Sequence, residues 1–261
     1  MAVRAGIGGW TFAPWRGTFY PKGLPQAREL EYASRRVTAI EVNGTFYRTQ
    51  SPESFRKWAQ ETPEDFVFAL KGHRVVTNRK VLAEAGPSIE TFLGSGVTAL
   101  GRKLGPINWQ LAPTKRFDPD DLDAFLSLLP RERDGLRLRH AIEARHESFV
   151  TPAFVDLARR HGVAIVFADS DDYPAIPDPT ADFVYARLQR CREGEPAGYP
   201  PEEIELWARR AGNWASGIVP ADLAPVKGES ETGPARDVFV FFIAGEKVRA
   251  PAAAAALIGH L

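Results

Sequence analysis

Eight short β-rich runs, separated by segments of helical character, constrain the fold of this chain more than any other feature. They occupy residues 5–10, 38–46, 66–72, 106–112, 139–146, 163–170, 182–189 and 237–246. Strands that are joined by crossover helices run parallel, with right-handed connections. Eight such units in roughly 250 residues are typical of a TIM-type (β/α)8 barrel. The sequence therefore predicts one α/β barrel domain over residues 1–261.

Helix-start signals support this alternation. A proline in the first turn of a helix is favoured because its missing N–H would have no partner there. Such prolines open four segments with helical apolar spacing, at Pro52, Pro119, Pro152 and Pro201. The region 73–105 is weakly patterned, so we expect the barrel to be irregular there.

A doubly wound open sheet is the competing architecture. Gly6, Gly8 and Gly9 come close to the dinucleotide-binding spacing, but the pattern stops at Trp10. No other predicted strand is followed by G-x-G-x-x-G opening a helix. The barrel is therefore the favoured fold.

The composition narrows the class of protein. Cys191 is the only cysteine, which excludes an intrachain disulfide and fits a reducing cytosol. The N-terminus lacks a secretory signal, and no apolar run approaches the ~18–20 residues of a membrane span. The 33 basic and 33 acidic residues cancel, so no overall charge draws the chain to nucleic acid or a membrane. We expect a soluble cytoplasmic protein with no membrane partner.

Polar and charged residues stand in pairs late in three of the predicted strands. The pairs are Glu41 with Asn43, Glu143 with Arg145, and Tyr185 with Arg187. Residues two positions apart share one face of a strand. Active sites of TIM-type barrels lie at the C-terminal ends of the strands. If the shared face points inward, the three pairs meet at the mouth of the barrel.

Three further strands end in polar side chains, which are Lys71, Gln110 and Asp169. The predicted mouth then sets three carboxylates against three cations: Glu41, Glu143 and Asp169 against Lys71, Arg145 and Arg187. Burying an unpaired ion costs several kcal/mol, so these groups must pair with one another or meet a ligand. Structural ion pairing would explain any one of them, whereas six at six strand ends favour a ligand-binding mouth.

This set of groups suits a substrate with a phosphate or carboxylate group, held by guanidinium groups while a carboxylate transfers a proton. The candidate catalytic residues are Glu41, Glu143 and Asp169. The candidate substrate-binding residues are Asn43, Tyr47, Lys71, Gln110, Arg145, Tyr185, Arg187 and Trp10.

Aromatic side chains are expected at the rim of the mouth. The rings of Trp10 and Tyr47, for example, would either pack against the protein or stack on a sugar or base of the substrate.

A divalent metal ion could also bind at the mouth. The carboxylates would provide oxygen ligands for it, but Lys71 and Arg145 compete for the same oxygens. We therefore predict no metal ligand and leave the cofactor unknown.

Several of these segments follow one another as in a known family. They are Glu41-Val42-Asn43-Gly44-Thr45-Phe46-Tyr47, Glu143-Ala144-Arg145-His146 and Tyr185-Ala186-Arg187, with Trp10, Trp15, Lys71 and Gln110 in the expected order. In these features the chain resembles the domain of unknown function 72 family, the YecE-like proteins. The resemblance implies a TIM-type barrel and no particular reaction. Members have been likened to endonuclease IV and sugar-isomerase barrels, which is an analogy to phosphodiester or sugar chemistry.

The chain departs from that family pattern at several strand ends. Gln189 and Arg190 stand where the seventh strand usually carries His-Gly, and Ile243 stands where the last strand usually reaches asparagines. Asn78 replaces a histidine after Thr77. The resemblance thus implies a divergent member, with a different substrate or with binding alone.

Three functions stay open from the sequence. The first is a hydrolase that acts on a phosphate-bearing sugar or nucleic-acid fragment, with Glu143 or Glu41 as the general acid–base. The second is a non-catalytic module that binds an anionic metabolite or single-stranded nucleic acid. The third is a sugar isomerase-like enzyme that uses the same carboxylates. In each case the expected partner is an anionic small molecule or a nucleic-acid fragment.

Overall fold

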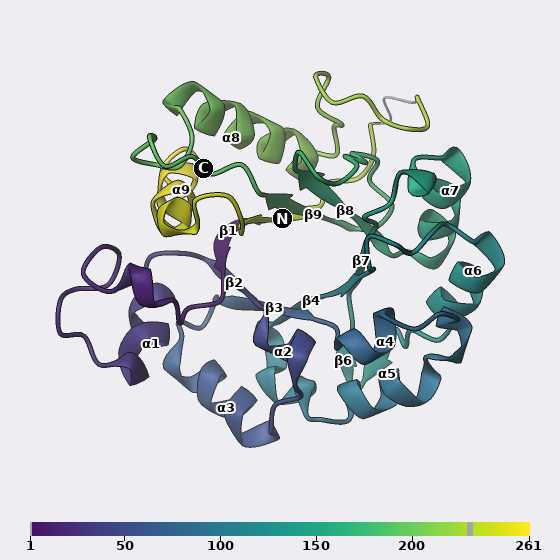
Figure 1. Cartoon of the computed structure of the whole chain (residues 1–261), viewed down its shortest axis with the longest axis horizontal. Helices are drawn as coiled ribbons and strands as arrows, with labels where there is room; N and C mark the ends of the chain where they lie inside the picture. Colours follow the sequence, from purple (N-terminus) through teal and green to yellow (C-terminus); the bar gives the residue numbers. More distant parts are fainter. Residues whose placement is uncertain (1, 229–231) are drawn as a thin grey trace.

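A closed barrel of eight parallel strands forms the centre of the computed structural model, which describes residues 2–228 and 232–261. The strands are β1 (Val3–Gly8), β2 (Ala39–Val42), β3 (Val67–Lys71), β4 (Leu104–Gln110), β7 (His140–Glu143), β8 (Ala164–Asp169), β9 (Phe183–Leu188) and β10 (Asp237–Phe242). Around the barrel they follow the order β1-β10-β9-β8-β7-β4-β3-β2. Figure 1 looks into this ring, with the helices outside it. The predicted TIM-type fold is confirmed, and each strand overlaps one of the eight expected runs, although β1 and β4 each begin two residues before the run.

The four helices predicted from proline starts are present. They are α3 (Pro52–Glu61), α6 (Pro119–Ser127), α7 (Pro152–His161) and α8 (Pro201–Ala215). Ser51 accepts a hydrogen bond from the Ser54 N–H at the start of α3, and Asp118 does the same for α6. These caps satisfy N–H groups that have no partner inside the helix. The helices α1 (Glu29–Ala33) and α9 (Ala250–Ile258) complete the ring beside β1 and β10.

The irregular crossover expected over 73–105 consists of short helical pieces. They are α4 (Arg74–Thr77), a 3₁₀ turn at Leu82–Glu84, α5 (Gly86–Leu93) and a 3₁₀ segment at Val97–Lys103. Gly96 has φ 101°, a conformation that favours glycine, just before the last of these segments. A small hairpin of β5 (Glu132–Arg133) and β6 (Leu136–Arg137), absent from the expected elements, precedes β7.

The second strand is shorter than the predicted run 38–46. It ends at Val42, and residues Gly44–Tyr47 form the helical turn α2. The Thr45 hydroxyl donates to the carbonyl of Val42 at 2.9 Å and lies 2.7 Å from the carbonyl of Lys71. These hydrogen bonds hold the turn α2 against the ends of β2 and β3, so β2 ends at Val42.

Side chains alternate between the inside of the barrel and the helix-facing core. The inward set below the mouth is made of small residues and a few rings: Ala39, Val67, Ala69, Ala141, Ala164, Val166, Phe183, Tyr185, Phe239 and Phe241. Gly6 belongs to the inward side of β1, because a Cβ there would lie 3.3 Å from the inward ring of Phe241; it would also lie 1.9 Å from the carbonyl oxygen of Ala39, which leaves no room for a side chain. Above this apolar layer, the inward positions at the ends of β2, β3, β4, β7 and β9 are polar. Within the described residues, no helix combines the length and apolar character that crossing a membrane requires.

Candidate active site

Arg187 lies at the centre of the barrel mouth between two carboxylates. Its Nε and Nη2 donate to Glu41 Oε2 and Oε1, each at 3.1 Å. Its Nη1 donates to both oxygens of Glu143, at 2.7 and 2.8 Å. The side chains of both glutamates are fully buried, and that of Arg187 is 4% exposed. Three predicted site residues from β2, β7 and β9 therefore form one buried ion cluster.

Neighbouring strands saturate the remaining lone pairs of Glu143. Gln110 Nε2 donates to Glu143 Oε2 at 2.8 Å, and Asn108 Nδ2 donates to the same oxygen at 3.0 Å. Arg145 Nε donates to Oε1 at 2.8 Å. The parallel register explains this convergence, because Gln110 of β4 lies directly beside Glu143 of β7. The two oxygens of Glu143 thus accept five hydrogen bonds in total, and neither oxygen is left without a donor.

Tyr185 and Lys71 complete the cluster at its two sides. The Tyr185 hydroxyl donates to Glu41 Oε2 at 2.6 Å from the layer below. Lys71 Nζ donates to Gln110 Oε1 at 2.7 Å and lies 4.4 Å from the centre of the Phe46 ring. Lys71 therefore touches a neutral amide and an aromatic face, and both carboxylates are engaged by other donors.

The pKa values of the buried groups differ, and only that of Lys71 lies near neutral pH. Burial alone would raise the pKa of Glu143, but Arg187, Arg145 and Lys71 lower it to about 2. Burial, and then Glu41, raise the pKa of Tyr185 well above its usual value, so it stays neutral. Burial and the charge of Arg187 lower the pKa of Lys71 to about 8. Lys71 is therefore the group of the cluster whose pKa lies nearest to neutral pH.

Arg145 is the guanidinium that faces outward. Its side chain is 16% exposed, four times the exposed fraction of Arg187. Nη1 lies 3.3 Å from the Tyr173 hydroxyl, and the guanidinium carbon lies 4.2 Å from the centre of the Tyr173 ring. Arg145 is therefore the cation of the cluster with the most exposed side chain, whereas Lys71 is only 6% exposed.

Asp169 does not join this cluster, and the prediction that it lines the mouth is wrong. Its carboxylate lies 3.4 Å from Arg190 Nη1 and 3.4 Å from the Tyr199 hydroxyl. Burial raises the pKa of Asp169 against the opposing charge of Arg190. On β8 the inward positions are Ala164 and Val166, so alternation turns Asp169 outward.

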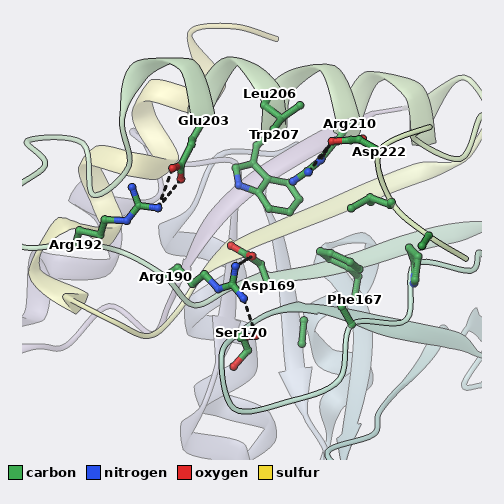
Figure 2. Close-up of a pocket in the computed structure, with 15 residues that line it drawn as sticks. Phe167, Asp169, Ser170, Arg190, Arg192, Glu203, Leu206, Trp207, Arg210 and Asp222 are labelled. Atoms are coloured by element: carbon green, nitrogen blue, oxygen red, sulfur yellow. Dashed lines mark hydrogen bonds and ion pairs between the residues drawn. The ribbon is translucent and has the colours of Figure 1, made fainter. Parts of the chain in front are cut away.

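Asp169 instead borders a hollow of about 560 Å³ between β8 and α8. In Figure 2, Trp207 points from α8 toward Asp169, and three arginines each meet a carboxylate around it. The pairs are Arg190 with Asp169, Arg192 with Glu203, and Arg210 with Asp222. These charges balance, so the hollow has no excess charge of either sign.

Three other predicted residues lie around the mouth without joining the ion cluster. Trp10 packs edge-on against Trp58 of α3 at 5.0 Å between ring centres, and against Phe68, whose side chain faces away from the barrel interior. Trp10 is half-buried in this aromatic group, and its contact with a substrate stays a prediction. Tyr47 is 63% exposed on the rim, where its contact with a substrate stays a prediction. The Asn43 amide lies over Gly8, 3.0 Å from where a Cβ would stand.

The site also contains residues that sequence reasoning missed. Asn108 is fully buried and shares the inward face of β4 with Gln110, so its spacing was a usable signal. Phe46, whose ring lies 4.4 Å from the Lys71 ammonium, is in the predicted family segment but not among the predicted site residues, and Tyr173 lies on a loop with no motif. Among the described residues, no group of three or more His, Cys, Asp or Glu side chains is arranged to hold a metal ion. The oxygens of Glu41 and Glu143 are occupied by guanidinium, amide and hydroxyl donors.

Comparison with known proteins places these features in a family context. The family model described as protein of unknown function DUF72 matches residues 4–261. UPF0759 protein YecE from Escherichia coli (strain K12) is 29% identical over 123 residues, which cover 46% of this chain and 42% of that protein. The match therefore spans less than half the length of this curated relative.

Two solved structures share the fold over nearly the whole chain. A DUF72 family protein from Thermotoga maritima MSB8 superposes with a TM-score of 0.75 at 21% identity, covering 99% of this chain and 98% of that one. SacUVDE superposes with a TM-score of 0.55 at 10% identity, covering 99% of each chain. At these identities the likeness concerns the barrel fold alone.

Proposed function

The chain belongs to the DUF72 family, and because that description names no reaction, we propose from the mouth itself that the protein is an acid–base enzyme for a small anionic substrate. In this proposal Arg145 contacts the anionic group and Lys71 transfers the proton. The observation that carries it is the Lys71 ammonium, which lies beside two arginines and makes no contact with a carboxylate in the described part of the chain.

The charge count at the mouth supports an anionic substrate. With Asp169 outside the barrel, the cluster holds Lys71, Arg145 and Arg187 against Glu41 and Glu143. Three cations against two carboxylates leave one positive charge. A phosphate or carboxylate group would offset it, with the free edge of Arg145 able to donate to two oxygens.

The state of Lys71 supports proton transfer. With a pKa of about 8, about a tenth of the lysine is neutral at pH 7. A general base works best when its pKa lies near the working pH. Glu143 does not meet this condition, because its pKa of about 2 keeps it ionised and its oxygens are saturated. We therefore assign Glu41 and Glu143 to holding the guanidinium groups in place.

Lys71 is the one group of the cluster with a pKa near neutral pH, and a single acid–base group favours an isomerase-like reaction over hydrolysis. Lys71 alone can remove a proton beside a carbonyl and return it to the neighbouring carbon, while Arg145 stabilises the oxyanion that develops. Hydrolysis of a phosphoester is the second candidate. There the Lys71 ammonium would protonate the leaving oxygen, and the two cations favour the charge on the phosphoryl group.

Deuterium exchange tests the proposal directly. Phosphorylated aldoses and ketoses are incubated with the protein in deuterated buffer at pH 8, and loss of the C–H signal and release of phosphate are followed by NMR. We expect exchange in the wild type and a loss of about 10²-fold or more in Lys71→Met. The exposed Lys22→Met serves as the matched control and should keep full activity.

The outcomes separate the candidate functions. Phosphate release without exchange would favour the hydrolase. Binding of the sugar phosphates with neither exchange nor release would favour a binding module. Exchange that survives unchanged in Lys71→Met would overturn the assignment of the proton-transfer group.

A further inference from the structure

Lys247 is a second lysine at the barrel mouth that forms no ion pair with any residue that the structure describes. It lies in a 3₁₀ turn (Lys247–Arg249) that follows β10, at the same end of the barrel as the ion cluster. Its ammonium lies 4.7 Å from the centre of the Phe12 ring and 5.4 Å from that of Trp15. Across residues 2–228 and 232–261, its ammonium makes no hydrogen bond or ion pair.

The turn that carries Lys247 is held firmly in place. The indole N–H of Trp15, a fully buried side chain, donates to the Lys247 carbonyl at 3.0 Å. The carboxylate of the adjacent Glu246 accepts the Val248 N–H at 3.4 Å, and among the described residues it forms no ion pair with Lys247. The lysine stem is thus directed over two rings, with its charge half-buried and its three donors free.

Stacking on aromatic rings is the plain structural explanation for this position. Such a contact contributes about 0.5–2 kcal/mol. Burial nevertheless lowers the pKa of Lys247, with only the more distant charge of Glu41 opposing it. The Glu41 oxygens are already held by Arg187 and Tyr185. Stacking therefore leaves the positive charge of Lys247 partly desolvated and without a contacting anion. An anionic ligand would compensate that charge.

The barrel order places Lys247 opposite the first anion contact. Counting around the eight strands, β10 lies four strands from β4, and β1 lies four strands from β7. Gln110 and its partner Lys71 belong to the β3–β4 side, and Arg145 follows β7. Lys247 follows β10, so the two groups of cations face each other across the mouth.

Gly8 ends β1 between β10 and β2, and the side chains of Asn43 and Ile243 pack closely over it, because a Cβ at Gly8 would lie 3.0 Å from the Asn43 amide nitrogen and 3.4 Å from Ile243. The Asn43 amide is half-buried and has no hydrogen-bond partner in the part of the chain that the structure describes. It offers both a donor and an acceptor on the same side as Lys247.

We propose that Lys247 and Asn43 form a second anion subsite, so that the substrate is a small molecule with two anionic groups, one held by Lys71 and Arg145 and the other by Lys247. The inference rests on the proposed function, whose site it extends. A sugar bisphosphate or a phosphorylated sugar acid has this chemistry. A substrate with one anionic group would leave the Lys247 charge uncompensated.

Paired probes test the second subsite by calorimetry. Fructose 1,6-bisphosphate is compared with fructose 6-phosphate, and 3-phosphoglycerate is compared with glycerol 3-phosphate, at low and equal ionic strength. Within each pair the probes differ by one anionic group. We expect the doubly anionic member of at least one pair to bind about tenfold more tightly or better.

Variants assign that gain to a residue. In Lys247→Met the advantage of the doubly anionic probe should disappear, while the affinity of the singly anionic probe stays unchanged. Lys247→Arg should restore part of the advantage, and Lys22→Met should have no effect. Arg145→Met should weaken both members of each pair. Circular dichroism of each variant verifies that the barrel is folded.

The results distinguish failure of this inference from failure of the proposed function. If both members of each pair bind equally and Arg145→Met weakens both, the second subsite is refuted and the first anion contact stands. If the advantage persists in Lys247→Met, the second group binds elsewhere and the assignment is wrong. If no probe binds the wild type, both proposals fail for these substrate classes.

Discussion

Removal of Arg187 is the most direct test of the buried cluster. In Arg187→Met the four hydrogen bonds to Glu41 and Glu143 are lost, and two fully buried carboxylates face an apolar side chain. Breaking a buried ion pair by removing one partner costs about 3–5 kcal/mol, because the remaining charge is uncompensated. For a domain of this size that loss corresponds to a fall in Tm of roughly 6–20 °C.

Urea unfolding at pH 7 measures this loss in the free energy of unfolding. Fluorescence reports the transition because six tryptophans are distributed over the chain. Arg192→Met is the matched control, since Arg192 is 47% exposed and its pair with Glu203 lies at the surface. The control should lose less than about 1 kcal/mol. A similarly small loss in Arg187→Met would refute the view that Arg187 compensates the two carboxylates.

A triple variant identifies the source of the loss. Glu41→Gln, Glu143→Gln and Arg187→Met together remove the charges as well as the pairing, so much of the lost stability should return. The pH dependence gives an independent reading. The pKa of Glu143 is lowered from 4.5 to about 2. Its contribution to stability is complete above pH 4.5 and disappears as the pH falls toward 2, and this dependence should be absent in the triple variant.

Three further measurements test single groups. Burial and the charge of Arg187 set the pKa of Lys71 to about 8, so an NMR titration of its ammonium should have a midpoint there, and a midpoint above 10 would contradict the proposed proton transfer. His140 has its pKa lowered by burial from 6.5 to about 4, so its contribution to stability should be complete above pH 6.5 and be lost as the pH falls through 4, with NMR showing a neutral ring at pH 6. Gly72→Ala would place a Cβ 2.2 Å from the Trp109 ring and should cost about 1–3 kcal/mol, whereas Gly44→Ala, with no atom within 4 Å, should cost nothing measurable.

Strand periodicity was sufficient to predict the centre of the site. Glu41, Glu143 and Arg187 each stand two residues after a small or aromatic inward residue, so the pattern placed them on one face before any contact was known. The same rule identifies the error at Asp169. Ala164 and Val166 face inward on β8, and an odd step from them turns the carboxylate toward α8. The position of Asp169 at the end of a strand suggests the mouth, but it is an odd number of residues from Val166 and so lies on the opposite face of β8.

Contacts between elements distant in the sequence could not be predicted. Trp10 follows β1 by two residues, but its partner Trp58 lies on α3, and only the crossover geometry brings the two rings together. Lys247 follows the last strand with no motif around it, so neither its aromatic neighbours nor its position opposite β4 could be foreseen. Asn108 differs from these two, because its spacing of two residues from Gln110 places it on the same inward face of β4 and makes it predictable.

The division of contacts at the mouth argues for a ligand rather than for structural pairing alone. A purely structural network of Glu41 and Glu143 would be complete with Arg187 and Arg145, since two carboxylates then meet two guanidinium groups. Lys71 and Lys247 add desolvated charges that contact amides and rings instead of carboxylates. Each is unfavourable to bury without an anion, and Lys71 is buried while Lys247 is half-buried. The glutamates therefore compensate the arginines, and the two lysines are left for a ligand to compensate.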